Sequence, residues 1–276
     1  MKKKLLCITL LFYITVFSQQ QFSGRVYYTF SMESFSDKLI DSVSNKAGGK
    51  SKKMSKMASD IFKNMKDVTT ILEFANGESL YYVKKEMKTE GKSRLNIVSV
   101  FAGNRSKYYL NHKKKDYYYQ TSTFGEDMLV EMKPKKWKIT QESQNIGGYL
   151  CYKAIDVEST NKKKKPVAWF TPQIPINAGP AKNFGLPGLI LKIEEYRRSY
   201  TAVKIELNQK EKIVIKKPTK GKLLTHEEFT KFLERISPFG KQKKKYTIVQ
   251  QKGMNGLSCP YEEGKIISKP CTLRDC

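Results

Sequence analysis

Histidine is scarce in this chain of 276 residues, and acidic residues are half as numerous as basic ones. The two histidines, His112 and His226, have no histidine or cysteine at a spacing typical of a metal site or of a Cys-His nucleophile. No Gly-x-Ser-x-Gly or Ser-x-x-Lys motif stands in suitable surroundings, and no glycine-rich loop precedes a helix as phosphate binding requires. The sequence therefore predicts no catalytic residue, cofactor or metal ligand, and favours a protein that is not an enzyme.

Long apolar runs are also absent, apart from one near the start of the chain. Leu5–Phe17 is too short for a comfortable membrane span, and it follows three lysines at positions 2–4. Val16 and Ser18 stand where small residues precede signal cleavage. We expect residues 1–18 to be a secretory signal and the mature chain to begin at Gln19. Cys7 lies too early in the run for lipid attachment, so no lipoprotein is predicted.

The excess of basic residues is the most distinctive feature of the composition. Lysine and arginine number 52 against 26 acids, and loss of the signal lowers the formal charge from +26 to +23. Such a charge favours anionic partners, namely lipid head groups, acidic polysaccharide or nucleic acid, or it serves solubility alone. Much of it lies in runs at expected loop tips, which are Lys113–Lys115, Lys162–Lys165 and Lys243–Lys245.

Nucleic acid is the least favoured of these partners. Tyr117–Tyr119 follow a lysine run, and bases can stack on aromatic rings above a basic groove. Strand alternation, however, places Tyr118 on the opposite face from its two neighbours, so at least one ring belongs to the core. An exported protein also meets little nucleic acid.

Four cysteines remain after cleavage, which are Cys151, Cys259, Cys271 and Cys276. An even number in an exported protein predicts two disulfides, and all three pairings are open. Their spacing fits no zinc pattern.

Residues 36–66 have a helical pattern. Leu39, Ile40 and Val43 indicate a short helix, and a second helix carries an apolar stripe opposite several lysines. This stripe covers a sheet, lies on anionic lipid or lines an apolar cavity, and the first interpretation is favoured. The candidate cavity-lining residues are Met54, Met57, Ile61, Phe62 and Met65.

Strand patterns follow from Val68 onward, separated by turn residues and without crossover helices. Asn76-Gly77 between two apolar segments is a strong hairpin pattern. The absence of helices between strands argues for an antiparallel meander and against a parallel nucleotide-binding fold.

The segment 189–207 is the clearest strand pair. Leu189, Leu191 and Ile193 alternate with more polar residues, and after a turn at Arg197-Arg198 the same holds for Thr201, Val203, Ile205 and Leu207. Alternation of this kind predicts one buried face on each strand. Gly185 and Gly188 allow a close backbone approach just before the first strand, and Pro187 fixes φ.

The chain is predicted to form one α+β domain rich in strands, over residues 19–239. A curved, half-barrel-like antiparallel meander carries the helical insertion 36–66, and a helix at 225–236 packs on it. Thr225 and Glu228 form a capping-box pattern at the start of that helix. Residues 240–276 are expected to be a basic, cysteine-bearing tail.

Two segments resemble the GLPGLI family. They are Trp137–Ala154, with Gly148-Tyr149-x-Cys151, and Ala168–Glu195, with Trp169-x-Thr171-Pro172. The second includes the hexapeptide Gly185, Leu186, Pro187, Gly188, Leu189 and Ile190. The resemblance implies an exported protein of Bacteroidota in the periplasm or cell envelope, with no assigned activity and no site residues to transfer.

The order of strands and helices is also similar to periplasmic lipoprotein carriers, in which a curved sheet surrounds an apolar cavity. This likeness implies a lipid or other amphiphile as ligand, although fold alone does not establish function. The alternative is an accessory that binds a protein of an outer-membrane transporter or surface assembly through its basic surface and tail.

Overall fold

The computed structural model describes residues 22–34, 36–48, 51–85, 96–123, 125–161 and 164–236. The chain divides into two compact units, Met1–His226 and Glu227–Cys276. The expected signal 1–18 and the tail 240–276 lie outside the described residues. No helix among the described residues is long and apolar enough to cross a membrane.

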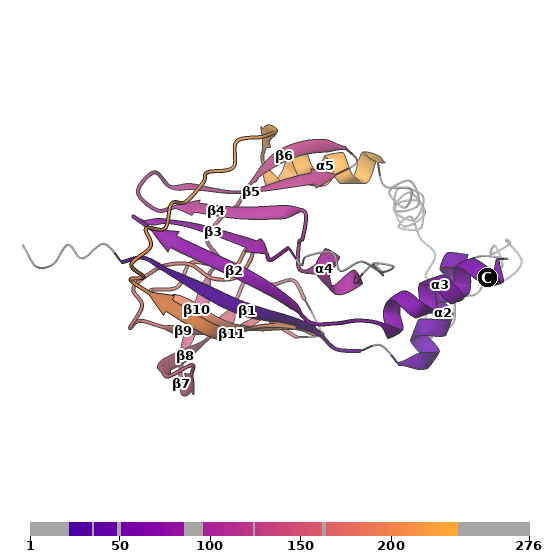
Figure 1. Ribbon diagram of the computed structural model, residues 1–276, viewed down its shortest axis with the longest axis horizontal. Coiled ribbons are helices and arrows are strands. Elements are labelled where there is room, and N and C mark those ends of the chain that lie inside the picture. The colour runs from indigo at the N-terminus through magenta and orange to yellow at the C-terminus, as the bar shows by residue number, and fades with distance from the viewer. Residues whose placement is uncertain are drawn as a thin grey trace, which may run out of the picture. The chain divides into compact units, whose positions relative to one another are not determined.

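The described part of the first unit is rich in strands, as the sequence predicts, and its twelve strands form one sheet (Figure 1). The strands are β1 (Gly24–Met32), β2 (Val68–Ala75), β3 (Glu78–Val83), β4 (Ser106–Asn111), β5 (Asp116–Thr123), β6 (Glu126–Glu131), β7 (Trp137–Ile146), β8 (Tyr149–Asp156), β9 (Val167–Thr171), β10 (Leu189–Glu195), β11 (Arg198–Leu207) and β12 (Lys222–Leu224). All neighbouring strands are antiparallel except β12, which pairs with β6 in parallel.

The sheet consists of two meanders joined by the first strand. The order is β12-β6-β5-β4-β3-β2-β1-β11-β10-β9-β8-β7, so β1 lies between β2 and β11. From β1 the chain meanders outward to β6, crosses to β7 at the far edge, and meanders back to β11. The strand content could be predicted locally, but this central place of β1 depends on pairing across the whole unit.

The crossing from β6 to β7 requires the sheet to be strongly curved. Glu131 ends β6 and Trp137 begins β7, so the link spans at most ~22 Å when fully extended. Eleven strands in a flat sheet at ~4.8 Å spacing would place β6 and β7 ~48 Å apart. The two strands can be joined only because the sheet curls, and this confirms the expected curved, open architecture.

The predicted hairpin at Asn76-Gly77 is confirmed. Both residues have positive φ, of 60° and 81°, which is the conformation of the tight turn that suits twisted strands. The turn joins β2 to β3, and Thr70 pairs with Val83 at the other end of the hairpin.

The predicted alternation along β10 and β11 is only partly right, because each strand contains a bulge. Tyr27 pairs with Lys204 and Tyr28 with Ala202, which leaves Val203 as an extra residue that is 62% exposed. Leu191 is likewise extra between the partners of β9, and it is buried together with Leu189 and Ile190, which precede it in β10. A bulge places two residues opposite one and reverses the alternation beyond it.

The inner face of the curved sheet is packed with aromatic rings. Tyr81 lies 6.5 Å from Tyr28 and 5.7 Å from Tyr108 between ring centroids, and Tyr108 stacks on Tyr119 at 5.3 Å. The segment 172–188 between β9 and β10 adds further side chains to this core, since Phe184 lies 5.1 Å from Tyr117. Its fully buried apolar residues are Ile174, Ala178, Phe184 and Leu186.

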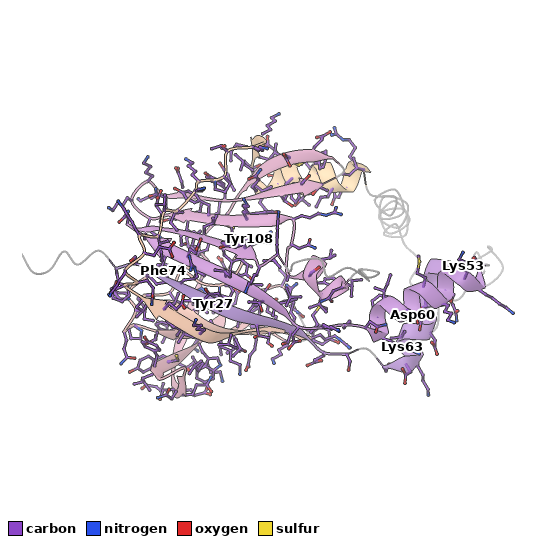
Figure 2. All side chains as sticks on the ribbon, in the orientation of Figure 1. Tyr27, Lys53, Asp60, Lys63, Phe74 and Tyr108 are labelled. Atoms are coloured by element: carbon purple, nitrogen blue, oxygen red, sulfur yellow. The ribbon has the colours of Figure 1, made fainter. Side chains whose placement is uncertain are left out.

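The two helices of the insertion, α2 (Asp37–Gly48) and α3 (Lys52–Lys63), pack against each other. Ile40 and Ser44 of α2 are buried, whereas Met57 of α3 is 53% exposed. Lys53 and Lys63 are labelled on α3 in Figure 2. Among the described residues α3 packs mainly on α2, whereas the sequence favoured packing on the sheet.

Two further helices complete the described part. The short helix α4 (Ile97–Phe101) is capped by Asn96, whose Oδ1 accepts from the Val98 N–H at 3.1 Å. Helix α5 (His226–Ile236) begins one residue after Thr225, as expected for a capping residue. It falls almost entirely in the second unit, so its packing on the sheet stays a prediction.

Candidate ligand-binding cleft

A cleft of about 480 Å³ opens at the end of the sheet where the β2–β3 and β4–β5 turns lie. Three parts of the chain meet there, namely the two turns and the segment between β9 and β10. The lining residues are Phe22, Phe74, Ala75, Asn76, Gly77, Glu78, Ser79, His112, Lys113, Pro175, Ile176 and Asn177. Its volume lies within the ~300–1,000 Å³ typical of small-molecule sites.

One wall of the cleft is apolar. Phe22, just before β1, stacks on Phe74 of β2 with ring centroids 6.4 Å apart. Phe74 is buried and is labelled near the strand ends in Figure 2. Ile176 and Pro175 face the same space from the β9–β10 segment. The cleft can therefore shelter a hydrocarbon group.

The other wall is polar, and the position of Glu78 in it is well defined. Glu78 Oε1 accepts hydrogen bonds from the Tyr109 hydroxyl and, at 2.8 Å, from Asn111 Nδ2. Asn111 Oδ1 in turn accepts from the Lys114 N–H at 2.9 Å, which holds the β4–β5 turn. The pKa of Tyr109 is raised, mainly by burial and to a smaller extent by the hydrogen bond to Glu78.

Two buried polar atoms in the cleft lack partners among the described residues. Ser79 is 2% exposed, and its Oγ makes no hydrogen bond. His112 Nε2 is also buried and makes no hydrogen bond of ordinary geometry. The backbone of Asn177 nevertheless interacts with the ring and raises the pKa of His112, which favours the protonated form. Unpaired buried polar atoms cost free energy, which a bound ligand could recover.

His112 stands in the lysine-rich β4–β5 turn, yet it is only partly exposed. Its backbone N–H donates to Gly77 O at 3.1 Å, and its ring Nδ1 lies 3.4 Å from the Tyr117 hydroxyl, so the residue contacts both the β2–β3 turn and β5. Burial lowers its pKa from the ordinary value, and the nearby Asn177 backbone only partly offsets this. The ring is therefore neutral at pH 7 and can donate or accept one hydrogen bond.

The hexapeptide does not line the cleft, but it holds the β9–β10 segment that does. The Gly185 N–H donates to Asn177 Oδ1 at 2.5 Å, which fixes Asn177 at the edge of the cleft. Leu189 N–H and Ile190 N–H bond to Ile174 O and Ala178 O, both at 3.0 Å. The buried Tyr28 hydroxyl donates to Ile190 O at 2.7 Å. The motif is thus part of the core, and through Asn177 it positions one wall of the cleft.

The glycines of the motif are required by close contacts. Gly185 has φ of +111°, and a Cβ there would lie 2.5 Å from Lys135 O. At Gly188 a Cβ would lie 2.2 Å from Thr171 O. These contacts confirm the predicted close backbone approach.

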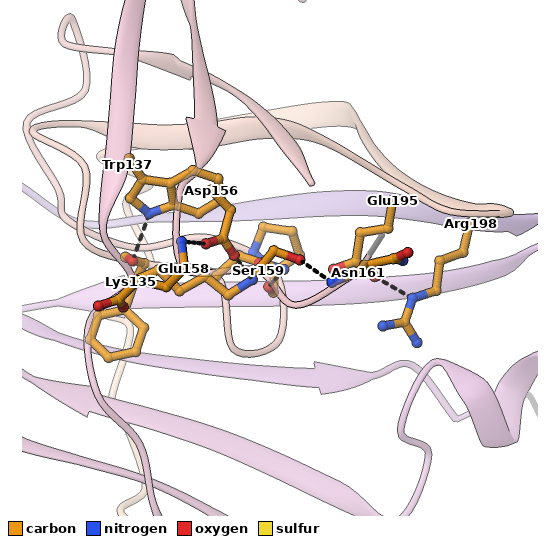
Figure 3. Close-up of polar contacts among 11 residues, drawn as sticks. Lys135, Trp137, Asp156, Glu158, Ser159, Asn161, Glu195 and Arg198 are labelled. Atoms are coloured by element: carbon orange, nitrogen blue, oxygen red, sulfur yellow. Dashed lines mark hydrogen bonds and ion pairs between the residues drawn. The ribbon is translucent and has the colours of Figure 1, made fainter. Parts of the chain in front are cut away.

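A polar cluster beside the motif joins the β6–β7 link to the end of β8 and to the β9–β10 segment (Figure 3). Trp137 Nε1 donates to Phe184 O at 3.1 Å, and the Lys135 N–H bonds to the same oxygen at 3.1 Å. Lys135 Nζ pairs with the buried Asp156 carboxylate at 3.0 Å. The tryptophan noted in the sequence therefore serves the fold, by holding the β6–β7 link to the β9–β10 segment.

The remaining predicted residues lie elsewhere. Met57, Ile61, Phe62 and Met65 belong to α3 or follow it, and they line none of the described clefts. The side chain of Met54 lies outside the described part of the structure. Cys151 is a buried free thiol. Cys259, Cys271 and Cys276 lie outside the described residues, so the disulfides stay a prediction. No group of three or more potential metal ligands gathers within the described ranges.

The tyrosine run is divided between the two faces, as alternation predicts. Tyr119 packs on the inner face, whereas Tyr118 belongs to a small outer cluster with Leu80 and Tyr109. Ser79, His112 and Asn177 were not predicted as site residues. No local pattern marks them, because they meet only through the turns and the β9–β10 segment.

Comparison with known proteins gives a partial match. Residues 156–192 match the family model Porph_ging, described as a protein of unknown function, and this segment includes the hexapeptide. No curated protein matches the chain. Two structures of PNGF-II are similar over 76% of this chain and 32% of theirs, in space groups P21 (TM-score 0.48, 14% identity) and C2 (TM-score 0.44, 15% identity). The chain thus spans about a third of their length, and over residues 156–192 it is similar to a family without an assigned function.

Proposed function

We propose that this chain is an exported, non-enzymatic protein of the GLPGLI family that resides in the periplasm or cell envelope. In this proposal it binds one small amphiphilic ligand in the cleft between the β2–β3 turn, the β4–β5 turn and the β9–β10 segment. The observation that carries the proposal is the buried Ser79 Oγ, which has no partner among the described residues, in a cleft that also holds His112 and an apolar wall.

This combination favours a ligand with two different ends. A hydrocarbon group would pack on Phe22, Phe74 and Ile176, where burial of apolar area supplies the binding energy. A hydroxyl or carboxylate head group would bond to Ser79 and to the neutral ring of His112. Pockets that combine a mostly apolar lining with a few convergent polar groups are typical of small-molecule sites.

The direct test is a titration with glycerol monolaurate, which has a hydrocarbon chain and a hydroxyl head group. We expect saturable binding by isothermal titration calorimetry. Ser79→Ala should weaken it by about tenfold, because one hydrogen bond to the head group is lost. Ser44→Ala is the matched control, since Ser44 is also buried and unpartnered but lies on α2.

The outcomes separate cleanly. Binding that Ser79→Ala weakens and Ser44→Ala leaves unchanged supports the cleft as the site. If Ser79→Ala and Ser44→Ala bind with the same affinity, the ligand binds outside the cleft. If the protein does not bind glycerol monolaurate, and native mass spectrometry finds no co-purifying lipid, the proposal is contradicted.

Export is tested independently of the ligand. Intact-mass analysis of protein recovered from the envelope should give a chain that begins at Gln19. A chain that retains Leu5–Phe17 would contradict the expected cleavage.

A further inference from the structure

A second hollow, of about 350 Å³, lies on the sheet away from the ligand-binding cleft. It is bounded by β4, β5, β6 and the segment that leads into β12. We call it the basic groove. Its lining residues are Arg105, Lys107, Gln120, Thr121, Ser122, Asp127, Lys216, Lys217, Pro218, Thr219 and Lys220.

The wall formed by residues 216–220 is fixed by the fold on both sides. The buried Pro218 accepts a hydrogen bond from the Tyr118 hydroxyl at 3.2 Å. Gly221 approaches β6 so closely that a Cβ would lie 2.3 Å from Asp127 O, and β12 then pairs in parallel with β6. The lysines on this wall are therefore held beside Arg105 and Lys107, and the groove does not depend on a free loop.

The charges in the groove are poorly balanced. Of its five cations, Lys217 pairs with Asp116 at 3.2 Å. Within the described ranges Arg105, Lys107, Lys216 and Lys220 form no ion pair, and all four are exposed. Asp127 is the one carboxylate in the lining. Like charges held together in a concave site attract multivalent anions.

The lining also narrows the class of anion. It contains no aromatic ring, so it offers no platform on which a nucleic acid base could stack. It has no large apolar side chain that could insert into a bilayer. It does present the polar groups of Gln120, Ser122 and Thr219 beside the cations, which suits a ligand that carries hydroxyl groups as well as charge.

We propose that the basic groove binds an anionic oligosaccharide bearing sulfate or phosphate groups. The site is distinct from the ligand-binding cleft and does not rest on the proposed amphiphile. Its charges are exposed, so the affinity should fall steeply with added salt.

The experiment uses the whole chain and a fluorescein-labelled sulfated hexasaccharide, followed by fluorescence anisotropy at low and physiological salt. The test variant is Lys216→Glu with Lys220→Glu. The control is Lys210→Glu with Lys212→Glu, which changes net charge equally at exposed positions of the same segment outside the groove. We expect the test variant to bind about tenfold or more weakly, because two cations are lost and two repulsive charges are added, and the control to bind within about twofold of the unchanged protein.

A separate arm measures sedimentation with phosphatidylcholine vesicles with and without phosphatidylglycerol. Binding of the hexasaccharide that only the groove variant weakens supports the proposal. Equal weakening by both variants would reduce the effect to net charge and overturn it. If the unchanged protein binds anionic vesicles but not the hexasaccharide, and the groove variant loses vesicle binding, the groove is a membrane-binding site. That outcome would also overturn the proposal. Ser79→Ala should leave hexasaccharide binding unchanged, so failure of either site is distinguishable.

Discussion

At the scale of single residues, a glycine of the hexapeptide stands where no side chain has room, and Gly148 provides a comparison. Gly185 and Gly148 both have positive φ, of +111° and +85°. They differ in their surroundings, since a Cβ at Gly185 would lie 2.5 Å from Lys135 O and a Cβ at Gly148 would meet nothing within 4 Å. The pair therefore separates backbone strain from steric exclusion.

We predict that Gly185→Ala lowers the free energy of unfolding by ~3 kcal/mol or more, and Gly148→Ala by ~1 kcal/mol. The larger loss at Gly185 arises because the β6–β7 link must move away from the β9–β10 segment. Urea unfolding of both variants measures the difference. Equal losses would show that the contact with Lys135 is unimportant.

Ser79 and Ser44 each bury a hydroxyl without a partner, so both cost stability in the free protein. We predict that Ser79→Ala and Ser44→Ala each raise the free energy of unfolding by ~1 kcal/mol. Thermal unfolding without ligand measures this. A loss of stability in Ser79→Ala would mean that its hydroxyl already has a partner in the free protein, and the proposed ligand site would lose the open polar group on which it rests.

His112 makes stability depend on pH in a definite direction. Burial lowers its folded-state pKa below the ordinary value of about 6.5, so the unfolded chain takes up the proton first. The stability that neutral, buried His112 contributes is fully present above about pH 6.5. It is lost as the pH falls below about 6.5 and through the lowered pKa of the folded state.

We therefore expect His112→Gln to lose less stability than the unchanged protein between pH 7 and pH 5. Urea unfolding at both pH values gives the comparison, and carboxylates that titrate in the same range cancel because both proteins contain them. The same pH dependence in both proteins would contradict a buried, neutral His112.

At the scale of elements, the two bulges decide which side chains of β10 and β11 are buried. Val203 and Leu191 are each the extra residue of a bulge, yet Val203 is 62% exposed and Leu191 is 0% exposed. Both stand on the predicted apolar faces, so sequence alternation does not distinguish them.

We predict that Leu191→Ala lowers the free energy of unfolding by ~2–5 kcal/mol, whereas Val203→Ala changes it by less than ~0.5 kcal/mol. Chemical unfolding of both variants checks this. A comparable loss at Val203 would indicate regular alternation through β11 and hence no bulge there.

The extent to which the elements could be predicted follows from the range of the forces involved. The β2–β3 hairpin was predictable because Asn76-Gly77 favours its turn within four residues. The bulge at Val203 was not, because it arises from the register between β1 and β11, which are far apart in the chain. The cleft residues Ser79 and His112 were missed for the same reason, since only pairing of the turns brings them together.

At the scale of the molecule, Cys151 bears on whether the tail is tied to the sheet. Burial raises the pKa of its thiol to about 11, so at pH 8 only about one thiol in a thousand is ionised. In the described structure the thiol is free and buried.

We predict that iodoacetamide at pH 8, without reductant, leaves Cys151 unmodified in the native protein and modifies it after unfolding. Peptide mass spectrometry locates the modification. A Cys151 that resists modification even when unfolded, until a reductant is added, would instead establish a disulfide to Cys259, Cys271 or Cys276.

The sequence by itself determined the strand-rich class, the turns and the helical segments, because these depend on hydrophobic periodicity and on backbone preferences of neighbouring residues. It also located the hexapeptide, whose glycines are needed wherever two backbones approach closely. Only the tertiary structure decided that β1 is central and that Ser79, His112 and Asn177 share one cleft. These features arise from pairings between strands and turns that are distant in the chain, and no local pattern encodes such contacts.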